Sequence, residues 1–306
     1  MGARPIDLHL KALRLMGASI TETHGFIDCE AAHLHGARIH LDFPSVGATE
    51  NIMLAAVLAD GETVISNAAR EPEITDLQGF LNAMGAKVRG AGTGTIAIQG
   101  VKALHHAEYT IMPDRIVAGT MLTAAAMTKG EITLTDIEPE HLSPIVSKLA
   151  ETGCTIHEYD RAITLRAPQV IQPIDCLRTL PHPGFPTDMQ SQMMAYLCLA
   201  KGTSICIETV FDSRNKHVGE LKRMGANIIL SQDGQTSVIQ GVARLNGAVV
   251  AAKDLRGGAA LVLAGLVAEG QTVVTHSGHI KRGYEHLAAD LSALGAKISF
   301  HDSEKK

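Results

Sequence analysis

The apolar positions of this chain follow two alternating spacings. Five times, apolar residues three and four apart, typical of one face of a helix, run up to a glycine, and the alternation typical of a strand follows. A glycine that ends a helix adopts a left-handed conformation that other residues reach only at a cost. The five stretches are LRLMGASI, LNAMGAKV, LAETGCTI, LKRMGANI and LSALGAKI, with glycines Gly17, Gly85, Gly153, Gly225 and Gly295.

A second motif precedes four of these stretches by 23 to 25 residues, glycine to glycine. It reads LADGETVI, MTKGEITL, LAKGTSIC and VAEGQTVV, with glycines Gly61, Gly130, Gly202 and Gly270. One repeat therefore predicts two helices and about four short strands in roughly 70 residues. A unit of this size must pack against copies of itself.

The repeat also predicts the domain organisation. We expect units near 42–112, 113–181, 182–253 and 254–306, with 1–41 as the second half of an earlier unit. The motif that should precede Gly17 would fall before Met1, so the repeat predicts that a helix and a strand are missing there. Because six units divide evenly into two domains, we expect an incomplete first domain over 1–112 and a second domain of three units over 113–306.

Composition and charge exclude several classes of partner. The chain is 45% hydrophobic and 19% charged, with 29 Gly and no Trp, which is typical of a globular protein with helix packed on sheet. A net charge of −5 argues against a nucleic-acid partner, so an anionic ligand would need a few placed arginines. No apolar run reaches the length of a bilayer span, and no signal peptide is visible, so no membrane partner is expected.

The spacing of cysteines and histidines indicates which redox compartment the chain occupies and whether it binds a metal ion. The five cysteines form no CxxC pair, which favours a reducing cytoplasm: Cys29, Cys154, Cys176, Cys198 and Cys206. The fifteen histidines include no HExxH and no Cys/His set with zinc spacing, so no metal is expected.

Arginines recur in the loop before the Gly-Ala helices. Arg4, Arg70, Arg214 and Arg282 stand 11 to 15 residues before their glycines. A cation opposes the dipole at a helix N-terminus, but a guanidinium beside free backbone N–H groups makes a good anion site. The alternative for any one of them is a solvated, ion-paired loop, especially for Arg70, which stands near two glutamates.

The strand-to-helix junctions carry further candidates. Ser45 and Thr187 are predicted N-caps, with a ligand role as the alternative, and Asp188 in a first turn complements the helix dipole. Arg256 is followed by two glycines, which cost helix propensity and allow close approach to the backbone. GAGTGT at 90–95 resembles a phosphate loop, but it stands where the other units have hairpin turns, and we interpret it as a turn.

Eight segments in order resemble one known family over essentially the whole chain. They are GARPIDLHL, FPSVGAT, AAREPEI, PDR, HPGFPTDMQ, ETVF, DLRGGAALVLAG and RGYE, and they resemble the UDP-N-acetylglucosamine 1-carboxyvinyltransferases. The resemblance implies the α/β enolpyruvyl transferase fold, an inside-out α/β barrel of βαβαββ units in two domains, the first incomplete here. It also implies transfer of the enolpyruvyl group from phosphoenolpyruvate to the 3′-hydroxyl of UDP-N-acetylglucosamine, with release of phosphate and no dissociable cofactor. This is the first committed step of peptidoglycan synthesis.

The resemblance assigns roles to individual residues. Asp188 matches the family's aspartate at the sugar hydroxyl, and Arg256 and Arg282 match arginines that face phosphoenolpyruvate. The implied contacts to UDP-N-acetylglucosamine are Arg4, Pro5, Ile6, Asp7, Leu8, Ser45, Val46, Gly47, Asp188 and Val210. Phe43 stands where many members have lysine.

Two features of the family have no counterpart here. The family's proton-donor cysteine would stand three positions before Gly2, and its N-terminal Lys-Asn pair is absent too. We therefore expect the 306-residue chain alone to turn over slowly, since losing a general acid costs roughly 10²–10⁴-fold. A non-catalytic nucleotide-sugar-binding fragment, or the product of a decayed gene, stays open as an alternative, whereas the arginine set argues against a pure scaffold.

Overall fold

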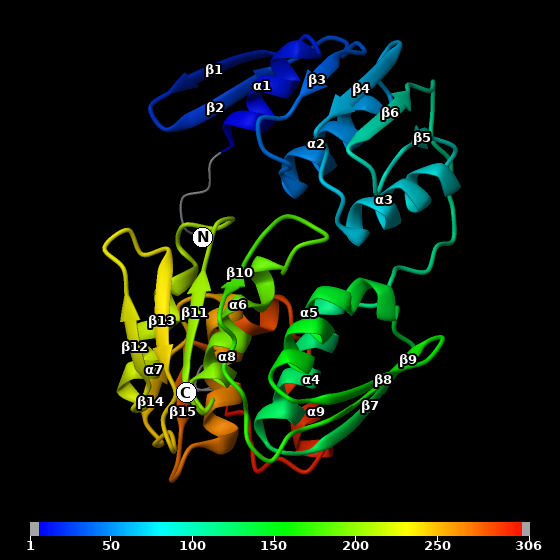
Figure 1. Cartoon of the computed structure of the whole chain (residues 1–306). Coiled ribbons are helices and arrows are strands. Elements are labelled where there is room, and N and C mark those ends of the chain that lie inside the picture. Colours follow the sequence, from blue (N-terminus) through cyan, green and yellow to red (C-terminus); the bar gives the residue numbers. More distant parts are fainter. Residues whose placement is uncertain (1–5, 302–306) are drawn as a thin grey trace. The chain divides into compact units, whose positions relative to one another are not determined.

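The computed structural model describes residues 6–301 (Figure 1). Its backbone contacts divide the chain into two compact units. Unit 1 comprises Met1–Met112 with Pro181–Pro183, and unit 2 comprises Pro113–Leu180 with Gly184–Lys306. Each unit has its own cluster of buried apolar side chains. No described helix combines the length and the apolarity that crossing a bilayer requires.

Within residues 6–112, unit 1 has three helices and two sheets. Its elements are α1 (Asp7–Leu15), β1 (Ser19–Thr23), β2 (Phe26–Glu30), β3 (Arg38–His40), α2 (Val46–Ala56), β4 (Glu62–Ser66), α3 (Pro72–Ala83), β5 (Lys87–Arg89) and β6 (Thr95–Gln99). β1 and β2 form an antiparallel hairpin, and the second sheet has the order β3-β4-β6-β5 with only β3 and β4 parallel. Buried positions alternate along β4 and β6, so one face of the sheet packs on the helices.

In its described residues, unit 2 repeats the alternation of helices and short strands seen in unit 1 and has three sheets. Its elements are α4 (Arg115–Met127), β7 (Glu131–Thr135), α5 (Pro139–Glu151), β8 (Thr155–Glu158), β9 (Ala162–Arg166), β10 (Leu177–Arg178), α6 (Thr187–Leu197), β11 (Thr203–Ile207), η1 (Arg214–His217), α7 (Val218–Arg223), β12 (Asn227–Leu230), β13 (Thr236–Gln240), β14 (Val249–Ala251), α8 (Leu255–Val267), β15 (Val273–Thr275), η2 (Ser277–Arg282) and α9 (Leu287–Ala293). The sheets are β7-β9-β8, β10-β11-β13-β12 and β14-β15.

The helices α4, α6 and α8 form the interior of unit 2, with the sheets outside them (Figure 1). α6 is buried continuously from Met189 to Leu197, so a helix with apolar and polar residues on all sides is enclosed by protein. Polar side chains on α6 therefore need specific partners within the protein.

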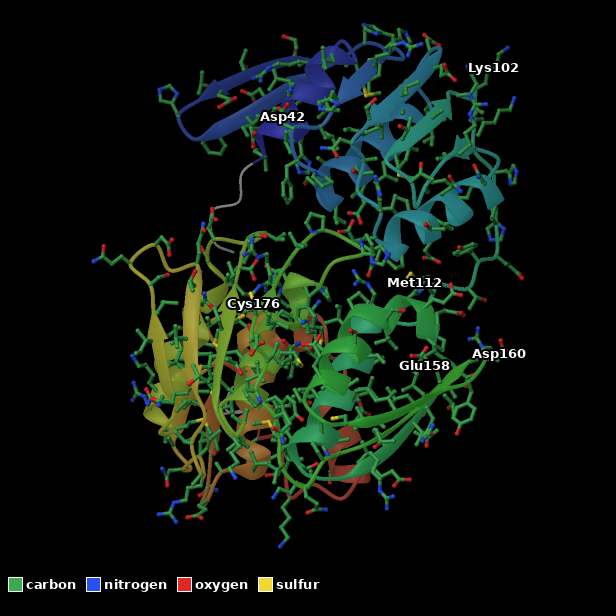
Figure 2. The ribbon with its side chains drawn as sticks, in the orientation of Figure 1. Asp42, Lys102, Met112, Glu158, Asp160 and Cys176 are labelled. Carbon is green, nitrogen blue, oxygen red and sulfur yellow. The ribbon has the colours of Figure 1, made fainter. Side chains whose placement is uncertain are left out.

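The turn between β8 and β9 points outward, as the labelled residues Glu158 and Asp160 show (Figure 2).

The predicted repeat is confirmed by backbone geometry. The five helix-ending glycines have φ between +93° and +100°, in the left-handed region that favours glycine. The second motif differs in one copy, where Lys129 with φ of 57° takes the left-handed position beside Gly130. GAGTGT forms the turn between β5 and β6, as predicted.

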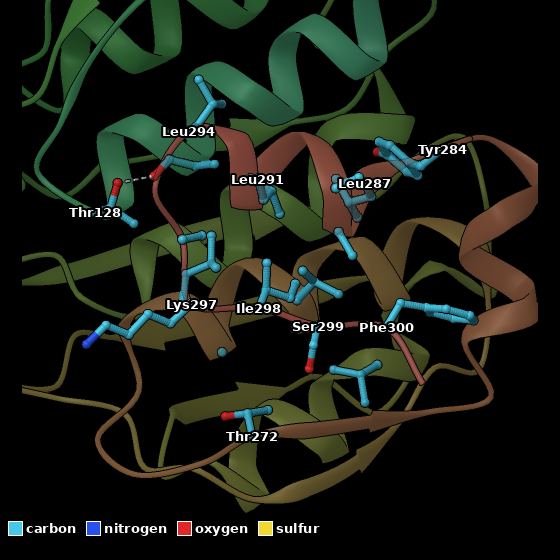
Figure 3. A pocket seen from close by; sticks show the side chains of 18 of the residues that line it. Thr128, Thr272, Tyr284, Leu287, Leu291, Leu294, Lys297, Ile298, Ser299 and Phe300 are labelled. Carbon is cyan, nitrogen blue, oxygen red and sulfur yellow. Dashed lines mark hydrogen bonds between the residues drawn. The ribbon is translucent and has the colours of Figure 1, made fainter. Parts of the chain in front are cut away.

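The prediction of a strand after Gly295 was wrong. In the two four-stranded sheets, the strands that follow the helix-ending glycine are β5 and β12. Each pairs with the next strand along the chain, β5 with β6 and β12 with β13. Within residues 6–301, no further strand follows Gly295 that could act as this partner. Because a strand needs a partner for its backbone groups, residues 296–301 form no strand. A groove of about 1200 Å³ opens there (Figure 3), lined by α8, β15, α9 and the 296–301 segment, with Leu287, Leu291 and Phe300 among its side chains.

Candidate active site

Three charged side chains meet at the start of α6 in unit 2. The carboxylate of Asp188 accepts from Arg214 Nη2 at 2.8 Å through Oδ1 and from Arg256 Nη2 at 3.2 Å through Oδ2. Asp188 stands in the first turn of α6, Arg256 in the first turn of α8, and Arg214 begins η1. The side chains of Arg214 and Arg256 are 10% and 13% exposed, while that of Asp188 is 40% exposed. The aspartate therefore faces outward from a base of two buried guanidinium groups.

The two arginines keep Asp188 ionised. Burial alone would raise the pKa of Asp188, but attraction to Arg256 and Arg214 outweighs it, so that pKa lies below its ordinary value. Burial also opposes the charge on Arg256, yet its attraction to Asp188 raises the pKa of the guanidinium. The carboxylate can therefore accept a hydrogen bond from a hydroxyl at neutral pH, although it is a weak base.

Arg256 has hydrogen-bonding capacity that its described surroundings do not use. Its Nε and Nη1 are buried and, among the described residues, have no hydrogen-bond partner. The guanidinium lies over the ring of Tyr284, 5.7 Å from the ring centroid. Buried donors without partners need an acceptor, and arginine N–H groups pair well with carboxylate or phosphate oxygens, so Arg256 is a candidate anion ligand.

A buried polar network extends from this cluster. Gln192 on α6 donates through Nε2 to Thr120 Oγ1 and to Tyr284 Oη, each at 3.2 Å. His217 is fully buried, and burial lowers its pKa to about 4, so it is neutral at pH 7 and adds no positive charge. The cations of the site are therefore the arginines.

The two glycines after Arg256 let neighbouring segments of the protein, and not a ligand, pack closely against the start of α8. A Cβ on Gly257 would lie 2.9 Å from His217 Cβ, and one on Gly258 would lie 2.7 Å from Ile280 Cγ1. The close approach expected from the sequence is thus made by η1 and η2. Asp254 caps α8 by accepting from the Gly257 amide at 2.8 Å.

One of the two predicted N-caps was wrong. Ser45 caps α2 by accepting from the Ala48 amide at 3.3 Å, as predicted. At α6 the N-cap residue is Pro186, and Thr187 stands one residue inside the helix. Its hydroxyl instead donates to Glu208 Oε2 at 3.0 Å and accepts from Arg214 Nε at 3.1 Å, because these buried charged groups offer stronger partners than the backbone.

The predicted nucleotide-sugar residues of unit 1 come from two adjoining helix starts. Ile6 precedes α1 as its N-cap residue and Asp7 and Leu8 begin the helix, while Val46 and Gly47 begin α2. The two helices contact each other at His9 of α1, whose ring forms a hydrogen bond with Asn51 of α2 at 2.5 Å. The same ring lies close to Gly47, because a Cβ added to Gly47 would be 3.4 Å from His9 Cε1. Arg4 and Pro5 lie outside the described residues.

The remaining predicted residues lie in unit 2. Val210 follows β11, and its amide donates to Glu208 Oε1 at 2.9 Å. The Arg282 side chain is exposed at the end of η2, and the next two residues, Gly283 and Tyr284, lie against Arg256. The structure therefore brings Asp188 to Arg256, and the Arg282 segment to Arg256.

Sequence reasoning missed Glu208, Gln192 and Tyr284. Each is a polar or aromatic residue buried beside the cluster. The available signals were that Glu208 begins the ETVF motif chosen for Val210 and that Tyr284 belongs to the RGYE motif chosen for Arg282. The groove of Figure 3 shares Tyr284 with these surroundings, but its described lining includes no arginine and not Asp188.

Comparison with known proteins gives consistent matches. The family model for EPSP synthase (3-phosphoshikimate 1-carboxyvinyltransferase) matches residues 1–291. UDP-N-acetylglucosamine 1-carboxyvinyltransferase 2 of Caldanaerobacter subterraneus subsp. tengcongensis is 57% identical over 298 residues, 97% of this chain and 71% of the relative. UDP-N-acetylglucosamine 1-carboxyvinyltransferase 1 of Symbiobacterium thermophilum is 55% identical over 300 residues, 98% of this chain and 67% of the relative.

Solved structures show the same fold. The enolpyruvyl transferase NikO from Streptomyces tendae has a TM-score of 0.87 at 24% identity, covering 97% of this chain and 72% of that one. EPSP synthase from Acinetobacter baumannii has a TM-score of 0.71 at 20% identity, covering 98% of this chain and 72% of that one. These two likenesses establish the fold.

Proposed function

This chain belongs to the UDP-N-acetylglucosamine 1-carboxyvinyltransferase family, and we propose that it transfers the enolpyruvyl group of phosphoenolpyruvate to the 3′-hydroxyl of UDP-N-acetylglucosamine. The hydroxyl oxygen adds to C2 of phosphoenolpyruvate while C3 gains a proton. The tetrahedral ketal then loses phosphate and a C3 proton, which restores the double bond. The product is the enolpyruvyl ether, and no redox step is involved.

The observation that carries this proposal is the pairing of Asp188 with Arg256. The reaction needs an acceptor for the hydroxyl proton and cations for phosphate and carboxylate. Asp188 is ionised and partly exposed, so it can accept a hydrogen bond from the sugar hydroxyl and orient its oxygen. Because its pKa is low, the proton passes on to phosphate or solvent rather than staying on Asp188.

Arg256 is proposed to bind the phosphoenolpyruvate anion. Its unpartnered Nε and Nη1 lie on opposite sides of the guanidinium, so each can donate to a different anionic oxygen while Nη2 stays on Asp188. This places the anion site and the hydroxyl acceptor on adjacent groups, which suits attack of one substrate on the other. Arg282 is proposed as a second cation for phosphoenolpyruvate.

The nucleotide sugar is proposed to contact the residues that the family resemblance assigns to it. In unit 1 these are Ile6, Asp7 and Leu8 at the start of α1 and Ser45 to Gly47 at the start of α2, together with Arg4 and Pro5, which lie outside the described residues. In unit 2 they are Val210 and Asp188. A role in peptidoglycan precursor synthesis in the cytoplasm follows from the substrates and belongs to the same proposal, as does the expectation that no dissociable cofactor takes part.

Calorimetry and phosphate release test the proposal. UDP-N-acetylglucosamine should bind the chain, and addition of phosphoenolpyruvate should release phosphate. Binding without release would favour the non-catalytic nucleotide-sugar-binding fragment. Absence of both, or phosphate release with shikimate 3-phosphate in place of the nucleotide sugar, would overturn the assignment.

A further inference from the structure

Glu208 is a buried carboxylate surrounded by donors. It directly follows β11 and is 2% exposed. Oε1 accepts from Thr179 Oγ1 at 2.8 Å and from the amides of Val210 and Phe211 at 2.9 Å each. Oε2 accepts from Thr187 Oγ1 at 3.0 Å. All four partners donate, so this position needs an acceptor on both oxygens, which a carboxylate provides and an amide does not.

One oxygen of Glu208 reaches Asp188 through two further residues. Because the Thr187 hydroxyl directs its hydrogen to Glu208, a lone pair of its oxygen is available to Arg214 Nε at 3.1 Å. Arg214 in turn donates from Nη2 to Asp188 Oδ1 at 2.8 Å. The bonds therefore run from Glu208 through Thr187 and Arg214 to Asp188, each donor facing an acceptor.

The other oxygen reaches Arg214 by a separate route. It holds the amide of Phe211, and the Phe211 ring lies under the guanidinium, with Arg214 Cζ 4.7 Å from the ring centroid. The same oxygen holds the amide of Val210, a proposed nucleotide-sugar contact. Arg214 is thus fixed at its edge by Thr187 and on its face by Phe211.

We propose that Glu208 is a positioning residue for the transfer reaction, which orients Asp188 through Thr187 and Arg214 and fixes the turn at Val210. This inference rests on the function proposed for Asp188. A group that orients a reacting hydroxyl must be held to within about 0.5 Å, and supporting hydrogen bonds provide that precision. Glu208 couples the nucleotide-sugar turn to the carboxylate that faces the hydroxyl.

Substitution of Thr187 tests the route from Glu208 to Arg214 through Thr187 separately from the route through Phe211. Thr187→Val keeps the shape but removes the hydroxyl, and Thr187→Ser keeps the hydroxyl. We expect Thr187→Val to lower kcat roughly ten- to hundredfold, the effect of one hydrogen bond to a charged group, with KM for UDP-N-acetylglucosamine within about threefold. Thr187→Ser should restore most of the lost rate. Thr152→Val, which removes another fully buried hydroxyl of unit 2, is the control and should leave kcat unchanged.

Glu208→Gln tests whether Glu208 acts through Thr187. An amide group facing Thr187 would donate to its oxygen and turn its hydrogen toward Arg214, so kcat should fall about tenfold. The double variant should lose little more than Thr187→Val alone, because both changes break one chain of bonds. Fully additive losses of kcat in the double variant would overturn the proposal. So would a Glu208→Gln variant that loses kcat and Tm together while Thr187→Val has no effect.

A substrate-free measurement keeps the two proposals separate. Hydrogen exchange of the Arg214 Nε–H group by NMR, assigned with Arg214→Lys, should quicken about tenfold or more in Thr187→Val and not in Thr187→Ser. If the unsubstituted chain releases no phosphate, the proposed function fails, and this exchange still decides whether Glu208 and Thr187 hold Arg214. Unchanged exchange in Thr187→Val and Glu208→Gln would overturn the inference.

Discussion

Asp188 and Arg256 meet at 3.2 Å from the first turns of two different helices, α6 and α8. The aspartate complements the dipole of its helix, whereas the arginine opposes that of its own. The pair is therefore better explained by what it can bind than by helix stability. The carboxylate is poised for a hydroxyl, and the remaining guanidinium donors are poised for an anion.

Asp188→Asn should lower the rate of phosphate release by roughly 10²–10³-fold. The amide keeps the size of the side chain, but it carries no charge and presents a donor to one of the two arginines. The rate should be measured with both substrates saturating. Asp233→Asn, in an exposed turn, is the matched control and should leave the rate unchanged. A rate for Asp188→Asn within threefold of the unsubstituted chain would exclude the proposed role.

Arg256→Lys should weaken phosphoenolpyruvate binding about ten- to hundredfold. Lysine keeps the charge but loses the separated donors of the guanidinium, so it cannot hold Asp188 and an anion in the same geometry. The expected change is in KM for phosphoenolpyruvate, with calorimetric binding of UDP-N-acetylglucosamine altered much less. Arg244→Lys, in an exposed ion pair with Glu269, is the control. Equal loss of binding for both substrates would show that Arg256 supports the fold of the site and not the anion.

The sequence predicted the repeat, and it gave roles to two of the three cluster residues, Asp188 and Arg256. Helix-ending glycines have a conformational signature, and φ near +95° at Gly17 and Gly85 confirms it. The approach of Arg214 to Asp188 was not predictable, because it depends on how η1 packs against α6. The role of Glu208 was hidden for the same reason, since its four partners come from three separate segments.

The two failures of prediction also have physical causes. The spacing after Gly295 is that of a strand, but pairing depends on a neighbouring strand and not on local pattern. Thr187 has the chemistry of an N-cap, but a buried carboxylate competes for its hydroxyl. In both cases tertiary contacts decided between local alternatives.

Gly258→Ala should destabilise the chain by about 1–3 kcal/mol and reduce activity. The added methyl group would lie 2.7 Å from Ile280 Cγ1 and 2.9 Å from Ala252 Cβ, so η2 must shift, and Tyr284 beneath Arg256 moves with it. Gly219→Ala is the matched control, because Gly219 lies in α7 with nothing within 4 Å of its added Cβ. It should be neutral or stabilising by up to about 1 kcal/mol. Denaturant unfolding measures both, and Ile280→Val should partly rescue Gly258→Ala.

His217 should make the chain less stable as the pH falls from 6.5 to about 4. Burial lowers its pKa to about 4, so in this range the unfolded chain binds a proton that the folded chain does not. Stability therefore rises with pH across this window, by roughly 3 kcal/mol in total, and is independent of His217 below and above it. His217→Gln removes the titrating group and should flatten the dependence of unfolding free energy on pH between 4.5 and 6.5. Replacement of the exposed His157 by Gln is the control, and a slope that persists in His217→Gln would assign the acid sensitivity to another group.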